Sequence, residues 1–232
     1  MNRKVEIEAL LNRADLSLVK ISKEYDMSLK SKNLSLDLLI DIKEYFSTLR
    51  SILDYLAHDI VHKFCPSANP KNNLYFPITQ HQNSFIIEIN KSFPELEQKN
   101  RNVYEILENM QVFKSQNNLW LSYFNKLNNE NKHQRLVPQT RIETKQVTVT
   151  GQNGGSVSYG SDVKFGNGVN IMGVPIDPIT QLPINNNTVK TEITTWVDFQ
   201  FEEINISAIW LTKESLKRIK GAFNSLSNEL YF

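Results

Sequence analysis

The sequence contains one cysteine, Cys65, in 232 residues, and it has no long apolar run. One cysteine forms neither a disulfide within the chain nor a cysteine-based zinc site. No stretch approaches the ~20 consecutive apolar residues that a helix needs to cross a bilayer. The N-terminus carries acidic residues at once and lacks the apolar core of a signal peptide. These absences predict a cytoplasmic protein without a membrane partner.

A large net charge of either sign is also missing. The chain has 26 basic and 25 acidic residues, which give a net charge of +1. Attraction to a nucleic acid would therefore require a local basic patch rather than the charge of the whole molecule. Hydrophobic residues make up 40% of the chain, which is ordinary for a globular protein and sufficient for a sizeable core.

Apolar positions recur at helical spacing through most of the first 137 residues. The spacing predicts helices over residues 3–30, 35–64, 80–91, 95–113 and 117–133. The second helix has the clearest pattern, with Ser35 as its N-cap and Cys65-Pro66 as its stop. In the first helix the apolar residues are spaced less regularly, at Val5, Ala9, Leu16, Val19 and Ile21.

The period changes after Pro138. Residues 140–165 alternate around the turn sequence GQNGG at 151–155, which is typical of a hairpin. Residues 166–188 are rich in Gly, Pro and Asn and predict a long loop, and alternation resumes over 189–207. Thr212 is the expected cap of a last helix.

We therefore predict an α+β fold, predominantly a bundle of four to six helices with a small antiparallel β insertion before the C-terminal helix. The length favours one domain over residues 1–232. Its parts are the helical bundle (1–137), the β-rich insertion (138–207) and the C-terminal helix (208–232), which returns to the bundle.

Polar residues interrupt the second predicted helix at intervals of four. They are Arg50, Asp54, His58 and His62. A helix advances by about 100° per residue, so such a row drifts by about 40° at each step. Arg50 and Asp54 are expected beside the core-facing apolar seam, and both histidines at the surface.

A second polar set ends the helix predicted over 117–133. Helical spacing puts Asn131 at the centre of its apolar stripe, with Asn128 beside it. A buried amide without a partner costs about 1–3 kcal/mol. Arg50 and Asp54 are suitable partners if the two helices pack together, so we expect the two polar sets to meet at one end of the bundle.

A site of this composition suits acid–base chemistry on an anion. His133 would transfer a proton, Arg50 or Arg135 would stabilise negative charge on a phosphate, and Asp54 would orient the base. The candidate catalytic residues are His133, Arg50, Asp54, Asn128, Asn131 and Lys132. Candidate nucleic-acid-binding residues are Arg135, Arg141 and Lys145, which would form a local basic patch.

No cofactor and no metal are expected. Histidines four residues apart on a helix can share an ion, which makes a set of Asp54, His58, His62 and His133 conceivable. Because the row of residues turns around the helix by about 40° at each step, His62 is expected to point away from the other three side chains. The sequence offers no further carboxylate that would complete such a metal site.

Several of these segments resemble a group of uncharacterised bacterial helical-bundle proteins that are HEPN-like in architecture. The resemblance covers roughly residues 36–137 and rests on residues 49–56 (LRSILDYL), on Phe-Pro-Ile at 76–78, and on Trp120-Leu121 leading into Asn-Lys-His at 131–133. Many HEPN domains are metal-independent ribonucleases or partners of nucleotidyltransferases. The resemblance implies a ribonuclease or RNA-binding component of a bacterial defence or toxin system.

Two hypotheses remain open at this stage. In the first, the protein is a HEPN-like ribonuclease that uses 2′-hydroxyl attack, with His133 as general acid–base and Arg50 stabilising the transition state. In the second, it is a non-catalytic interaction or dimerisation module. Its polar network would then fix helix register, and its β insertion would contact a protein partner or a second copy.

Overall fold

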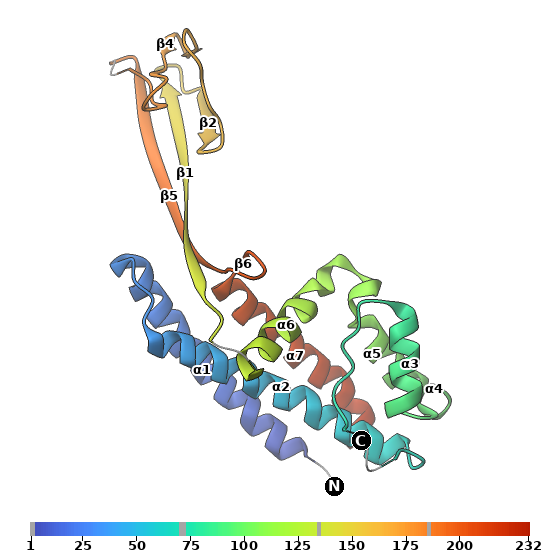
Figure 1. The fold of residues 1–232 in the computed structure, drawn as a ribbon. Coiled ribbons are helices and arrows are strands. Elements are labelled where there is room, and N and C mark those ends of the chain that lie inside the picture. Colours follow the sequence, from blue (N-terminus) through green and yellow to red (C-terminus); the bar gives the residue numbers. More distant parts are fainter. Residues whose placement is uncertain (1–2, 70–72, 134–135, 185–186) are drawn as a thin grey trace. The chain divides into compact units, whose positions relative to one another are not determined.

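The computed structural model describes residues 3–69, 73–133, 136–184 and 187–232, with the side chains of residues 131–133 left out (Figure 1). The chain divides into two compact units. Unit 1 comprises Met1–Thr140 and Gln200–Phe232, and unit 2 comprises Arg141–Phe199. The predicted class is confirmed, because the fold is mostly helical with an antiparallel sheet before the C-terminal helix.

Unit 1 is built from helices. They are α1 (Lys4–Ser31), α2 (Leu36–Phe64), α3 (Gln82–Ser92), α4 (Leu96–Lys99), α5 (Arg101–Asn109), α6 (Leu119–His133) and α7 (Ala208–Tyr231). Two short 3-10 turns, Val112–Lys114 and Gln116–Asn118, connect α5 to α6. Within the described ranges, no helix combines the length and the apolar character that a bilayer span requires.

The central element of unit 1 is α2, against which α1, α6 and α7 all pack. Its start follows from the sequence, since the Ser35 hydroxyl accepts a hydrogen bond from the Leu38 N–H at 3.1 Å. Its seam is buried from Leu38 to Ile60. In this core the Phe46 ring packs edge-on against the ring of Phe124 on α6, with the two ring centroids 5.7 Å apart. It also packs at a tilt against the ring of Phe201, with the centroids 6.2 Å apart.

The first helix forms as predicted, and it buries one regular face. The buried positions of α1 are Ile7, Leu11, Ala14, Ile21, Tyr25 and Ser28. Val5, Leu16 and Val19, which were named as apolar positions of the helix, are exposed. Helix α1 packs on α2 and α7.

The C-terminal helix begins earlier than Thr212, so that predicted cap is wrong. Ser207 is the N-cap of α7, and its hydroxyl accepts a hydrogen bond from the Trp210 N–H at 3.3 Å. Thr212 lies within the first turns, is fully buried, and donates its hydroxyl to the Ala208 carbonyl at 2.7 Å. Its hydroxyl is satisfied by the helix backbone, which makes Thr212 a core residue.

The sheet has the order β2-β1-β5-β6. Its strands are β1 (Gln139–Gly151), β2 (Ser156–Gly160), β5 (Val189–Phe201) and β6 (Ile206–Ser207). The predicted hairpin joins β1 to β2, with Val149 opposite Val157. Its turn uses Gly154 at a φ of +79°, a conformation that favours glycine.

The segment predicted as a long loop, 166–188, is partly ordered. It contains the short antiparallel pair β3 (Asn170–Ile171) and β4 (Val174–Pro175). The side chains of Ile171 and Ile176 pack with Val149 and Tyr159 in a small core of unit 2. The alternation of apolar and polar residues does not predict this pair of strands, because each strand has only two residues.

Candidate functional site

The polar pair predicted on α2 exists, and its two members bind each other. The Arg50 Nε donates to Asp54 Oδ2 at 3.2 Å, and Arg50 Nη2 lies 3.1 Å from Asp54 Oδ1. The two side chains are 12% and 18% exposed. The pair is therefore largely withdrawn from water, where each charge depends on the other for compensation.

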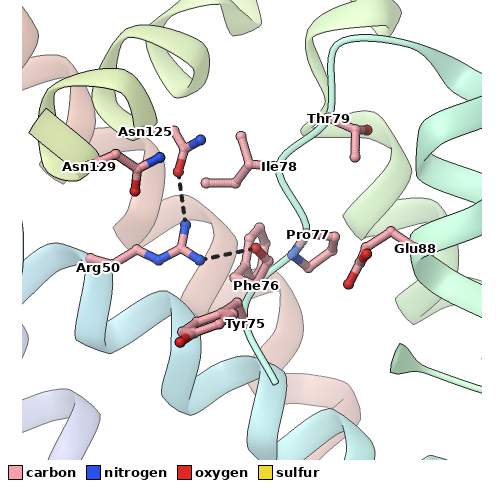
Figure 2. Close-up of a pocket in the computed structure, with 9 residues that line it drawn as sticks. All are labelled: Arg50, Tyr75, Phe76, Pro77, Ile78, Thr79, Glu88, Asn125 and Asn129. Carbon is pink, nitrogen blue, oxygen red and sulfur yellow. Dashed lines mark hydrogen bonds between the residues drawn. The ribbon is translucent and has the colours of Figure 1, made fainter. Parts of the chain in front are cut away.

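The Arg50–Asp54 pair also binds residues 75–79, a segment that follows α2 and the loop after it. The Phe76 N–H donates to Asp54 Oδ1 at 3.0 Å. The Phe76 carbonyl accepts from Arg50 Nη2 at 3.4 Å (Figure 2). Both backbone groups of Phe76 are thus bonded to charged side chains of α2, and the Phe76 ring is buried. The pair acts as a clamp on residues 75–79.

A second clamp on this segment comes from Gln111, which is fully buried. Its Oε1 accepts hydrogen bonds from the Thr79 N–H at 2.9 Å and the Thr79 hydroxyl at 3.2 Å. Its Nε2 donates to the carbonyls of Pro77 at 3.1 Å and Leu107 at 2.8 Å. These four bonds use the full capacity of the amide, so residues 75–79 are fixed at both ends.

The clamped segment forms one wall of a pocket of about 440 Å³. Arg50 on α2, Glu88 on α3, and Asn125 and Asn129 on α6 line the rest of it (Figure 2). Arg50 Nη1 donates to Asn125 Oδ1 at 3.4 Å, which connects α2 to α6. Helix α6 therefore supplies the Asn125 amide to Arg50, and Asn129, one turn later, lines the same pocket.

The charged side chains at this pocket are Arg50, its partner Asp54, and Glu88. Asp54 offsets the charge of Arg50, and Glu88, which accepts a hydrogen bond from the Ser92 hydroxyl at 2.7 Å, adds one carboxylate. The Tyr75 ring lies with its centroid 5.8 Å from Arg50 Cζ and is half exposed at the pocket. Two amides, one carboxylate and one ring suit a planar polar group that has hydrogen-bond donors and acceptors at its edge.

The other residues predicted on α6 are described only in part. Asn128 is buried at 3% exposure, and its Nδ2 has no hydrogen-bond partner among the residues that the structure describes. The side chains of Asn131, Lys132 and His133, and all of Arg135, lie outside the described part of the chain. Their assignment to a site stays a prediction.

The two remaining basic candidates belong to unit 2. Arg141 forms an ion pair with Glu143 two residues along β1. Lys145 lines a pocket within unit 2, beside Val147 and Tyr159. Each is described within its own unit, and their role in binding a nucleic acid stays a prediction.

The histidines of α2 are exposed, as helical drift indicates for His58 and His62. Across residues 3–69, 73–133, 136–184 and 187–232, no group of three His, Cys, Asp or Glu side chains is arranged to hold a metal ion. Both histidines instead line a pocket distinct from the one at Arg50.

Sequence reasoning missed Gln111, Asn125 and Asn129. A signal for Gln111 was present, since it is a lone amide between Met110 and Val112. Asn125 follows the buried Phe124 directly and precedes Asn129 by one helical turn. The amide cluster predicted from the apolar stripe begins at Asn128, whereas Asn125, which bonds Arg50, lies beside that stripe.

Comparisons of the chain with protein-family models, with curated proteins and with solved structures gave no match.

Proposed function

We propose that the chain is a HEPN-like RNA-binding protein whose pocket beside Arg50 takes an unpaired nucleobase. The observation that supports this best is the chemistry of the pocket walls. The amides of Asn125 and Asn129 and the carboxylate of Glu88 offer donors and acceptors to the edge of a base, and the Tyr75 ring offers a stacking surface. Unpaired bases in RNA are recognised in this way, by hydrogen bonds to their edges and by stacking.

The catalytic form of this proposal is a metal-independent ribonuclease of a bacterial defence or toxin system, acting in the cytoplasm. His133 would remove the proton from a 2′-hydroxyl, whose oxygen attacks the adjacent phosphorus. The 5′-oxygen leaves and takes a proton, which gives a cyclic phosphate and a free 5′-hydroxyl. Arg50 would stabilise charge in this step, supported by Asp54, and the basic candidates would bind the RNA backbone.

Binding is tested with short single-stranded RNA of each base, measured by fluorescence anisotropy. We expect Tyr75→Ala and Asn129→Ala each to weaken binding by about tenfold, since a stacked base or a good edge contact is worth about 1–3 kcal/mol. Asn117→Ala is the matched control, because Asn117 is exposed and lies outside this pocket. Equal losses in the control, or no RNA binding by the wild type, would refute the proposal.

Cleavage is tested separately on the same RNAs with the His133→Ala variant. If His133 is the general acid–base, the variant loses cleavage while its melting temperature and its RNA affinity stay near those of the wild type. Cleavage that persists in the variant removes His133 from the mechanism and leaves the binding proposal in place.

The second candidate is a non-catalytic interaction or dimerisation module, whose partner is another protein or a second copy. The observation that favours it is the internal use of the polar side chains. Arg50 forms hydrogen bonds with Asp54, Asn125 and the Phe76 carbonyl. Gln111 forms four hydrogen bonds, all within the bundle. Under this reading the wild type binds no RNA, and sedimentation or pull-down experiments identify the partner.

A further inference from the structure

A second pocket in unit 1, of about 420 Å³, lies along the C-terminal half of α2. His58, Val61 and His62 of α2 form one side of it. The chain from Cys65 to Asn69 and the residue Leu74 contribute further walls, together with Arg3 and with Lys91 and Ser92 at the end of α3. This pocket has no role in the function proposed above.

The ionisable side chains that line this pocket are basic, apart from the Cys65 thiol. They are Arg3, His58, His62 and Lys91. Arg3 is already paired with Asp59, whose Oδ1 lies 3.1 Å from Arg3 Nη1. Lys91 has no ion pair among the described residues, so the pocket carries one uncompensated positive charge before any imidazole is protonated.

The rest of the lining is largely apolar, with Val61, Leu74 and Pro66 among its walls. Cys65 adds no negative charge, because burial raises the pKa of its thiol to about 11 and keeps it protonated at neutral pH. A pocket with basic groups and apolar walls matches a ligand that has an acidic head group and an apolar body.

We propose that this pocket binds a small organic anion with an apolar body, and that His58, His62 and Lys91 hold its acidic head group. The site is independent of RNA binding at Arg50. A cation is the wrong ligand for it, since no acidic side chain is among the described residues of its lining.

Other charged and titratable groups near this pocket include Arg3 before α1, Asp59 on α2, and Tyr231 on α7, whose hydroxyl donates to Asp59 at 2.7 Å. Glu95 acts on the Cys65 thiol through its charge, and it is not among the lining residues. Asp59 is occupied by Arg3 and Tyr231, and it does not line the pocket.

The test uses 4-methylbenzenesulfonate, an aromatic anion, and its neutral counterpart 4-methylbenzenesulfonamide. Titration calorimetry measures the binding of each compound to the full chain at pH 7. We expect the anion to bind about tenfold or more tightly than the neutral compound, because only the anion is attracted by the charge of Lys91. Inorganic sulfate, which lacks the apolar body, is expected to bind more weakly than the aromatic anion.

Variants separate this site from general surface binding. The Lys91→Gln variant and the His58→Gln/His62→Gln double variant are each expected to weaken binding of the anion by about tenfold, since each removes hydrogen-bond donors to its acidic head group. His81→Gln is the control, since His81 is exposed and lies outside the pocket. Circular dichroism verifies that each variant is folded.

Three results would overturn the assignment. One is a wild-type affinity that is equal for the anion and the neutral compound. Another is wild-type affinity in the Lys91→Gln variant or in the double variant, or a comparable loss of affinity in His81→Gln. The third is the absence of measurable binding of the anion.

Discussion

Asp54 and Phe76 are joined by a hydrogen bond of 3.0 Å from the Phe76 N–H to Asp54 Oδ1, across 22 positions of the chain. The same carboxylate binds Arg50, whose guanidinium returns to the Phe76 carbonyl. The three groups form a closed set in which each polar atom of the clamp has a partner. Two side chains of α2, Arg50 and Asp54, thereby fix where the segment 75–79 enters the bundle.

Removing this carboxylate is expected to destabilise the fold strongly. The Arg50 side chain is only 12% exposed, and Asp54→Ala removes its counter-charge. The same substitution removes the acceptor of the Phe76 N–H. We expect the free energy of unfolding to fall by about 3–5 kcal/mol, the usual cost of breaking a buried pair from one side. Urea denaturation measures this change. Asp26→Ala, at an exposed position of α1, is the matched control and is expected to stay within about 0.5 kcal/mol of the wild type.

Gln111→Ala is expected to loosen the other end of the same segment. The substitution removes the partners of the Thr79 N–H and of the Pro77 carbonyl from a fully buried site. We expect a loss of about 2–4 kcal/mol in unfolding free energy, together with faster hydrogen exchange of the Thr79 amide. Gln98→Ala, on the exposed side of α4, provides the comparison. An unchanged exchange rate at Thr79 in the Gln111 variant would contradict the clamp.

The Cys65 thiol is expected to react slowly in the folded protein. Burial, aided by the charge of Glu95, raises its pKa to about 11, and the thiolate is the reactive form. At pH 8 we expect iodoacetamide to alkylate the native protein about a hundredfold more slowly than the urea-unfolded chain. Mass spectrometry of timed samples measures both rates. Equal rates would show that the thiol is accessible and ionised in the fold.

The same shift predicts a loss of stability in alkali. The folded pKa of Cys65 lies above the unfolded value, so its contribution to stability is complete below the unfolded pKa and disappears as the pH rises toward about 11. Burial raises the pKa of Tyr45 and of Tyr231 too, and both act in the same direction. Urea midpoints measured from pH 8 to pH 11 should therefore decline. The decline should be smaller in Cys65→Ala, and an equal slope would exclude a contribution from the thiol.

Unit 1 is expected to fold without unit 2. Just outside unit 2 the Glu202 N–H donates to the Pro138 carbonyl at 3.2 Å, and the Thr140 hydroxyl donates to Glu202 Oε1 at 2.7 Å. The two chain segments are therefore adjacent, and an Asn-Gly turn is suited to connect Thr140 to Gln200 when 141–199 are removed. We expect the shortened chain to keep the helical circular dichroism signal of unit 1 and a cooperative melt. A non-cooperative transition would show that unit 2 is needed for folding.

Much of the fold follows from local patterns in the sequence. The apolar seam of α2, its Ser35 cap and its stop at Cys65-Pro66 predict an element that the structure reproduces within a residue. The hairpin between β1 and β2 follows from alternation around a glycine-containing turn. These features depend on contacts between residues near one another in the chain, which is why spacing alone identifies them.

Two features were predicted less well. In α1 the prediction named Val5, Leu16 and Val19, which are exposed, whereas the buried face is formed by Ile7, Leu11, Ala14, Ile21, Tyr25 and Ser28. The heptad spacing of that buried face is present in the sequence. Thr212 satisfies the sequence rule for a cap, yet Ser207, where β6 ends, takes that role. The position of this cap depends on the neighbouring strand, which a pattern along one helix does not contain.

The candidate site, too, was predicted only in part from the sequence. Sequence alone identified Arg50 and Asp54 as polar residues beside a buried seam, because helical geometry fixes their angle to it. Only the tertiary structure determined what those side chains bind, since Phe76, Gln111 and Asn125 reach this place from other segments of the chain. Hydrogen bonds require atoms to meet within about 3 Å, and positions along a chain do not specify distances between segments until the packing of the helices has placed them.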